Sequence, residues 1–110
     1  MQSQHRLRKN SQFQAVYHKG KSVGARDIAL MYLPSSSLRV GFSVSRKVGI
    51  AVQRNLIKRR LRAAFRAEIP LIRQGLYIIV ARPSAAGADY QSLRRSLRYL
   101  LKKQQLYVSP

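Results

Sequence analysis

Hydrophobic residues along this chain follow two spacings, and their alternation predicts an order of elements. Two apolar runs, IALMYL at residues 28–33 and LYIIVA at residues 76–81, have the length of buried strands. Residues 39–45, RVGFSVS, alternate from position 40 on, with large apolar residues at even numbers and Gly or Ser at odd numbers. This segment therefore predicts a half-buried strand whose second face is smooth and polar.

Apolar residues at three- and four-residue spacing predict three helices. The first begins at Asn10 or Ser11, either of which can cap it, and ends at residues 19–21 (KGK). The second covers about residues 50–67, and the third starts at Asp89. The apolar faces consist of Phe13, Val16 and Tyr17 on the first helix and of Leu93, Leu97, Leu100 and Leu101 on the third.

The predicted elements follow the order αββαβα. That order indicates an α+β fold, an α/β sandwich in which helices pack on a small mixed sheet. A chain of 110 residues suffices for one domain with a modest core, and neither a repeat nor a dividing linker is visible. We therefore expect a single domain over residues 1–110, with the polar and basic residues 1–9 as a mobile tail.

The charge of the chain predicts a more specific role than that of a generic domain, namely the binding of a polyanion. The formal net charge is +19, from 22 basic and 3 acidic residues, yet 45% of the residues are hydrophobic, as in a folded protein. Such a domain repels itself unless a partner neutralises it, and nucleic acid is the usual partner. An anionic membrane is a weaker alternative, because the large apolar residues are needed for the core.

The same sequence contains no apolar run near 18 residues, no secretory h-region at the N-terminus and no Cys. We therefore expect neither a membrane span nor a disulfide, and we expect a cytoplasmic protein.

The second helix carries most of the interesting charge. Residues 46–66 include eight Lys or Arg and no acid. At 100° per residue, one face collects Ile57, Leu61, Ala64 and Phe65 and should lie on the sheet. The opposite face, on the order of 15–20 Å long, carries what we call the basic stripe, bordered by Lys58. The basic stripe consists of Asn55, Arg59, Arg62 and Arg66.

A helix that only faces solvent usually intersperses Glu with Lys, and this one does not. Arg guanidinium groups make paired hydrogen bonds with phosphates. The basic stripe is therefore predicted to bind phosphates.

The sequence offers no convincing set of catalytic residues for hydrolysis. Two-metal hydrolysis needs several converging carboxylates, whereas Asp27, Glu68 and Asp89 lie far apart in the sequence. His5 and His18, the only candidate acid–base residues of their type, are interpreted as surface histidines. We expect no catalytic residue and no metal site here, so another molecule must supply the catalytic groups.

Two features allow a structural and a functional interpretation. Phe13 and Tyr17, four residues apart, are the usual pattern of core aromatics, but they would also suit the stacking of unpaired bases. Ser43 and Ser45 are either ordinary solvent-facing residues or small polar contacts on an open sheet face. The two interpretations are compatible if the first helix lies at the edge of such a face.

Residues 39–66, RVGFSVSRKVGIAVQRNLIKRRLRAAFR, closely resemble the signature of the bacterial ribonuclease P protein subunit. The family pattern is a strand ending in S-[RK]-K-x-G, followed by A-V-x-R-N-x-x-K-R-x-x-R on a helix. Residues 6–17 are similar to the opening of the family, and residues 77–83 (YIIVARP) to its third strand. The resemblance covers nearly the whole chain.

The resemblance implies a protein cofactor of an RNA enzyme. In this family a catalytic RNA carries the active site and its Mg²⁺ ions, and the holoenzyme removes the 5′ leader of precursor tRNA. It implies one protein per RNA and a left-handed β-α-β crossover, where the general rule predicts a right-handed one. The implied contacts with the RNA subunit are Arg54, Asn55, Lys58, Arg59, Arg62 and Arg66. The implied leader-binding cleft consists of Phe13, Tyr17, Ser43, Ser45, Arg46, Lys47 and Arg82.

One position departs from the family pattern, and a second has two candidate residues. Many members have Arg directly after the Arg-Asn pair, and this chain has Leu56, so that contact is absent or comes from a neighbour such as Arg60. The aromatic expected on the early strand is Tyr32, unless Met31 takes that position.

Three other classes fit the charge and the size. A structural RNA-binding protein, such as a small ribosomal protein, would co-purify with ribosomal particles. A DNA-binding module would prefer duplex DNA to structured RNA. A stand-alone nuclease would cleave RNA without an RNA partner.

Overall fold

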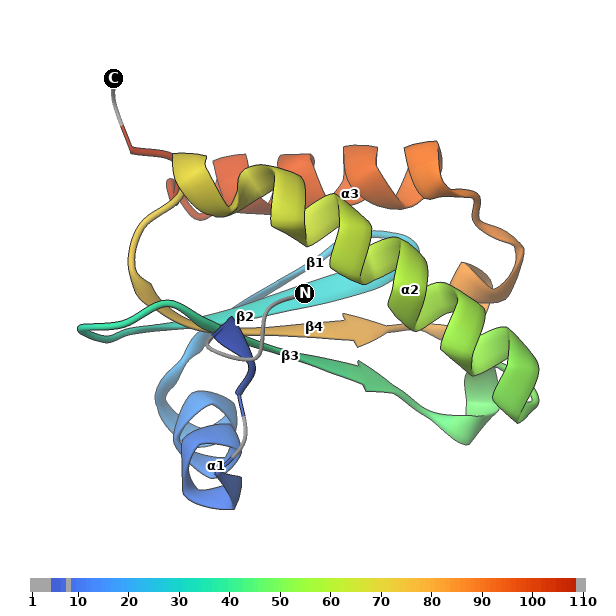
Figure 1. Ribbon diagram of the computed structural model, residues 1–110, viewed down its shortest axis with the longest axis horizontal. Helices are drawn as coiled ribbons and strands as arrows, with labels where there is room; N and C mark the ends of the chain where they lie inside the picture. Colours follow the sequence, from blue (N-terminus) through green and yellow to red (C-terminus); the bar gives the residue numbers. More distant parts are fainter. Residues whose placement is uncertain (1–4, 8, 109–110) are drawn as a thin grey trace.

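A four-stranded mixed sheet forms the centre of the molecule (Figure 1). The computed structural model describes residues 5–7 and 9–108. The strands lie in the order β1-β2-β4-β3; β3 runs parallel to β4, and the other neighbouring pairs are antiparallel. Their bounds are Lys21–Gly24 for β1, Ile28–Pro34 for β2, Arg39–Val44 for β3 and Gly75–Ala81 for β4.

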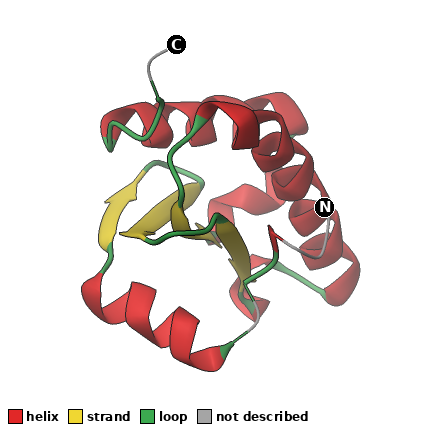
Figure 2. Ribbon diagram, turned by 60° about the vertical axis from the view of Figure 1, so that its left-hand side comes forward, coloured by secondary structure: helices red, strands yellow, loops and turns green. Residues whose placement is uncertain are grey.

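Helices cover the two faces of this sheet unequally (Figures 1 and 2). The three α-helices are α1 (Asn10–Lys19), α2 (Ala51–Glu68) and α3 (Tyr90–Lys103). The short 3₁₀ helices are η2 (Arg46–Val48), η3 (Ile69–Leu71) and η4 (Pro83–Gly87). Because α2 and α3 lie side by side on one face and α1 lies alone on the other, we call these the two-helix face and the one-helix face.

The two-helix face contains the main core, as the apolar patterns predict. The four α2 residues assigned to the sheet are all buried, and so is the whole leucine stripe of α3. Phe65 of α2 meets Tyr77 of β4 edge to face, with ring centroids 5.3 Å apart. Asp89 caps α3 as expected, because its carboxylate accepts a hydrogen bond of 2.8 Å from the backbone N–H of Ser92.

The one-helix face contains a smaller cluster. Its buried members are Leu7, Val16, Leu76 and Ile78. The backbone N–H of Leu7 donates to the carbonyl of Val40 over 2.9 Å, and Arg6 forms a bridge with the same residue. The expectation of a mobile tail over residues 1–9 is therefore wrong for residues 5–7, while residues 1–4 and 8 lie outside the described part.

The α+β class is confirmed, but the predicted element order lacks one strand. β1 was missed because KSVG offers neither alternation nor an apolar run, and it forms through its hairpin pairing with β2. The observed order is therefore αβββαβα. A second correction concerns α1: the capping position is Lys9, and no side chain caps it.

The unit β3-α2-β4 joins two parallel neighbours, as the resemblance implies, and its left hand stays a prediction from that resemblance. Within residues 5–7 and 9–108, no helix has the length and apolarity that crossing a membrane requires.

Candidate RNA-binding surfaces

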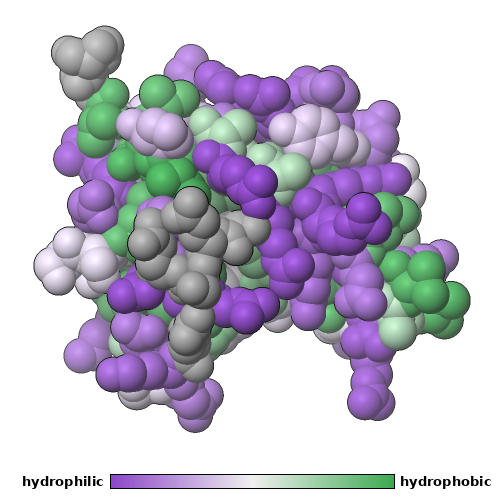
Figure 3. Space-filling view, viewed as in Figure 1, coloured by the Kyte–Doolittle hydropathy of each residue, from purple (hydrophilic) through white to green (hydrophobic). Residues whose placement is uncertain are grey.

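The basic stripe lies on the outer side of α2, away from the sheet. Asn55, Arg59 and Arg66 are exposed, whereas Lys58 and Arg62 are half-buried along the edges of the helix. Figure 3 shows hydrophilic side chains gathered over the middle of α2. The structure thus presents the predicted stripe as one surface, with the apolar side of the same helix holding it against the sheet.

All three acidic residues are engaged elsewhere. Glu68 is fully buried, where its carboxylate pairs with Arg98 over 3.2 Å and accepts a hydrogen bond from the Tyr107 hydroxyl. Burial first, and then this hydrogen bond, raise the pKa of Tyr107, so the hydroxyl stays protonated and donates. Asp27 is buried, with its Oδ1 3.8 Å from the Nε of Arg26.

The third acid, Asp89, is fixed as the cap of α3, and the hydrogen bond from the Ser92 backbone lowers its pKa. Among the described residues, no acidic side chain therefore forms an ion pair with the basic stripe.

Two other arginines of α2 have intramolecular surroundings. Arg60 donates from Nη1 to the carbonyl of Ala88 over 2.7 Å, which ties α2 to the segment before α3. This contact engages Arg60, the neighbour named above as a substitute for the family arginine that is absent at Leu56. Arg54 is half-buried, and its Nε is buried without a hydrogen-bond partner in the described part of the chain. An external acceptor would satisfy that nitrogen.

The one-helix face carries the aromatic residues of the implied leader cleft. Phe13 is half-buried and lies directly on the backbone of β3, because a Cβ added at Gly41 would come within 2.7 Å of its ring. Tyr17, one turn further along α1, is 46% exposed. Phe13 is thus partly a core residue, as its spacing suggested, whereas Tyr17 is not.

Next to α1 the sheet offers a half-buried row of small and medium residues. Ser43 of β3 pairs with Val80 of β4, which pairs with Ala29 of β2, and all three are half-buried. Figure 3 shows the lower outline of the molecule hollowed between α1 and the segment that follows β3. An open strip of sheet therefore borders the helix that carries the two aromatics.

Basic side chains lie at the end of this strip, where strands β3 and β4 end. Because β3 and β4 are parallel, the residues that follow them emerge at the same edge of the sheet. Ser45, Arg46 and Lys47 follow β3, Arg82 follows β4, and all four are exposed. The guanidinium of Arg82 lies against Gly24 of β1, in the space a side chain there would take. The implied leader-binding residues thus belong to one face and one edge.

Tyr32 and Met31, the two candidates for the family's early-strand aromatic position, pack on opposite faces of the sheet, and which of them takes that position stays a prediction. Tyr32 points to the two-helix face, and its hydroxyl donates to the carbonyl of Gln74 over 2.6 Å. Burial raises the pKa of this hydroxyl. Met31, the next residue along, packs on the one-helix face. Met31 is therefore the residue of the pair that can border the open strip of sheet beside α1. Side chains alternate between the two faces of a strand, so the sequence alone would have distinguished the two residues if the face of any one β2 residue had been known.

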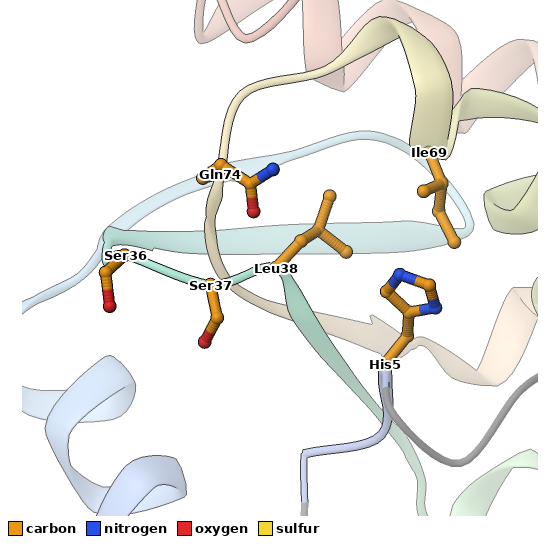
Figure 4. Close-up of a pocket in the computed structure, with 6 residues that line it drawn as sticks. All are labelled: His5, Ser36, Ser37, Leu38, Ile69 and Gln74. Carbon is orange, nitrogen blue, oxygen red and sulfur yellow. The ribbon is translucent and has the colours of Figure 1, made fainter.

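A separate pocket of about 410 Å³ lies behind the loop between β2 and β3 (Figure 4). Six residues line it: His5, Ser36, Ser37, Leu38, Ile69 and Gln74. The His5 ring lies toward Leu38 and Ile69, and both serine hydroxyls point away from it. One imidazole without a carboxylate or a second titratable group in the lining does not form an acid–base site. In the described ranges, moreover, no three His, Cys, Asp or Glu residues come together as a metal site.

The fold and these surfaces define a class: a small α+β domain with a strongly basic surface. The comparisons with known proteins identify the family. The family model described as Ribonuclease P matches residues 1–105. The ribonuclease P protein component of Bacillus velezensis is 39% identical over 110 residues, covering 97% of this chain and 95% of that protein. That of Caldanaerobacter subterraneus subsp. tengcongensis is 42% identical over 105 residues, covering 93% and 90%.

Solved structures agree with this assignment. The RNase P protein of Staphylococcus aureus superimposes with a TM-score of 0.87 at 34% identity, covering 94% of this chain and 98% of that one. The Thermotoga maritima protein gives 0.80 at 28% identity, covering 89% and 96%. The chain therefore belongs to the ribonuclease P protein component family. Proteins of this family are subunits of an endoribonuclease that acts in tRNA processing, and their partner is ribonuclease P RNA.

Proposed function

We propose that this chain docks through α2 on the catalytic RNA of ribonuclease P and holds the 5′ leader of precursor tRNA on its one-helix face. The observation that carries the proposal is the separation of charge. The three acids are buried or used as a cap, and the basic stripe faces outward with no acid on it. A folded surface of this kind binds a polyanion of defined shape.

The docking surface consists of Arg54, Asn55, Lys58, Arg59, Arg62 and Arg66. Their guanidinium and ammonium groups replace counterions at the RNA phosphates, so the binding free energy contains a large term that weakens with salt. The half-buried Arg54 and Lys58 add contacts at the border of the stripe. Because α2 is fixed by its apolar side, these groups are positioned before the RNA binds.

The leader-binding surface consists of Phe13, Tyr17, Ser43, Ser45, Arg46, Lys47 and Arg82. Unpaired bases stack on the exposed part of the α1 aromatics, and the cations at the strand ends bind the leader phosphates. Stacking and phosphate contacts are largely independent of base identity, so this surface favours a leader of almost any sequence. The protein thereby raises the affinity for precursor over mature tRNA.

In this proposal the protein supplies no catalytic group. The RNA subunit carries the active site and holds the Mg²⁺ ions that promote endonucleolytic hydrolysis of the phosphodiester bond. One protein binds each RNA, in the cytoplasm. The protein lowers the Mg²⁺ concentration that the assembly needs, because its cations neutralise part of the RNA charge.

The test is cleavage of the 5′ leader from a precursor tRNA at low Mg²⁺. Four samples are compared: protein alone, ribonuclease P RNA alone, both together, and both after the protein stock has been treated with ribonuclease and freed of it. Cleavage only with both components supports the proposal. Cleavage by the treated protein alone would locate an active site in the chain, and no stimulation at all would favour a structural RNA-binding protein.

A further inference from the structure

An apolar patch is exposed at the N-terminal end of α2, beside the basic stripe. We call Ile50, Val52 and Leu56 the α2 apolar patch; their exposed fractions are 69%, 73% and 39%. Val52 and Leu56 are one turn apart and so lie on the same side of the helix. Figure 3 shows hydrophobic surface at the right-hand end of α2, adjoining hydrophilic side chains. Single exposed apolar residues are ordinary, but two on one side of a helix end, with a third exposed at the N-cap of the same helix, form a patch.

The local structure gives no reason for apolar residues at positions 50 and 52, the two most exposed of the patch. Ile50 is the N-cap of α2, a position where Ser, Thr, Asp or Asn would accept a hydrogen bond from the first turn. Ile50 offers no acceptor, and Gln53 reaches back so that its Oε1 accepts from the Ile50 backbone N–H over 3.1 Å. Val52 is β-branched and nearly free of packing, which also weakens a helix. Residues that work against local stability indicate a contact outside the chain.

The surroundings of the patch restrict what that contact is. Arg54 and Asn55 lie between its members in sequence, and Arg46 and Lys47 belong to η2, which packs against α2. None of the three acids forms an ion pair with these cations: Asp27 lies beside Arg26, Glu68 pairs with Arg98, and Asp89 caps α3. A second copy of the chain would set one net charge of +19 against another. The partner must combine negative charge with apolar surface.

We propose that the α2 apolar patch contacts an unpaired nucleobase of the ribonuclease P RNA. RNA presents this combination, since unstacked bases in loops and bulges have apolar faces a few ångströms from their phosphates. In duplex DNA, Leu, Ile and other apolar side chains insert between base steps, so aliphatic groups can pack on the face of a base. The inference rests on the proposed docking through α2 and deepens it. At Leu56, where many members of the family have Arg, this chain replaces a salt-dependent contact by an apolar one.

The two kinds of contact differ in how they respond to salt and temperature. A phosphate contact contributes to the slope of the logarithm of affinity against the logarithm of salt concentration. An apolar contact leaves that slope unchanged and contributes a negative heat-capacity change on binding. The α2 apolar patch is thus separable from the basic stripe by measurement.

The first experiment measures binding of the full chain to in vitro transcribed ribonuclease P RNA of Bacillus velezensis at several salt concentrations and temperatures. The variant is Val52→Ser with Leu56→Ser, and circular dichroism verifies its folding. The matched control is Val108→Ser, the same change at a residue that is 46% exposed and remote from α2's first turn. We expect the double variant to lose affinity roughly ten-fold, with an unchanged salt slope and a less negative heat-capacity change.

The same experiment distinguishes failure of this inference from failure of the proposed function. Unmodified protein that does not bind the RNA overturns both. Unmodified protein that binds while the double variant binds equally well overturns only the base contact, and so does an equal loss in the Val108→Ser control. A loss of affinity accompanied by a shallower salt slope also overturns it, because the patch would then act through charge.

A second variant tests the exchange at Leu56 directly. Leu56→Arg should steepen the salt slope by roughly 0.7–0.9 and make the heat-capacity change less negative, so that it binds better than the unmodified chain in low salt and worse in high salt. Tighter binding at every salt concentration would contradict the proposal. Sedimentation of the RNA-free protein completes the test: a dimer that Val52→Ser with Leu56→Ser dissociates would assign the patch to self-association instead.

Discussion

The two faces of the sheet differ in how completely they are covered. In the described part of the chain, twenty-one buried residues form the cluster under α2 and α3, and only four form the cluster under α1. Both faces use the same strands, whose side chains alternate between them. The two-helix face therefore contributes most of the folding free energy, and the one-helix face keeps a half-buried strip beside its aromatics.

The inequality follows from where this chain places its apolar side chains, most of which pack under α2 and α3. A strip that is half-buried in the free protein is what a flat, stacking ligand can cover at little cost in rearrangement. The comparison predicts that stability and leader binding respond to different substitutions.

The largest effect is expected in the closed core. Leu97→Ala, at a fully buried position of α3, should lower the free energy of unfolding by about 3–5 kcal/mol, because it removes buried methylene and methyl groups and leaves a cavity. Val16→Ala, also fully buried but under α1, should cost about 2 kcal/mol. Urea unfolding of both variants measures the difference. Equal losses would show that the two faces contribute alike.

A smaller effect is expected where α1 touches the sheet. Gly41→Ala introduces a Cβ 2.7 Å from the Phe13 ring, so the ring must move, at about 1–3 kcal/mol. Because Phe13 is also a proposed stacking residue, the preference for precursor over mature tRNA should fall, while affinity for the RNA subunit persists. Filter binding with both tRNAs and with the RNA subunit measures this. A variant that loses RNA-subunit binding while remaining folded would contradict the separation of surfaces.

The sequence predicts the closed face better than the open one. The leucines of α3 and the inner residues of α2 repeat at helical spacing, and burial follows from that repeat alone. β1 could not be found, since KSVG is a strand only by pairing with β2. The partial packing of Phe13 depends on the absence of a side chain at Gly41, 28 residues away, which no local pattern reveals.

The candidate site likewise has some features that local sequence spacing predicts and others that it does not. The spacing of the basic stripe predicted that its four residues share the outer side of α2, because one helix places them all; three of them are exposed and Arg62 is half-buried. By contrast, the contact of Arg60 with Ala88 and the burial of Glu68 beside Arg98 and Tyr107 join elements far apart in sequence. Such contacts are set by tertiary packing, so spacing along one element does not predict them.

An exposed aromatic tests the open face with little effect on folding. Tyr17→Ala removes a side chain that is 46% exposed on α1, and its proposed stack with a leader base is worth about 1–2 kcal/mol. Tyr99→Ala is the matched control, since this tyrosine is 55% exposed on α3 and contacts Lys103. Leader-bearing substrate should bind less tightly to the Tyr17 variant alone. Equal weakening by both variants would remove Tyr17 from the leader-binding surface.

The smallest effect on folding is expected from substitutions in the basic stripe of α2. The inner side of this helix belongs to the closed core, whereas the stripe on its outer side should affect mainly the salt dependence of RNA binding. Arg59→Ala should change stability by less than about 0.5 kcal/mol, because the side chain is exposed and away from the core. It should weaken binding to the RNA subunit and reduce the magnitude of the salt slope by roughly 0.7–0.9, the share of one phosphate contact. Arg95→Ala, an exposed arginine of α3, is the control. Unchanged slopes in Arg59→Ala and in Arg62→Ala would count against docking through α2, and a loss of slope only in Arg95→Ala would move the docking surface to α3.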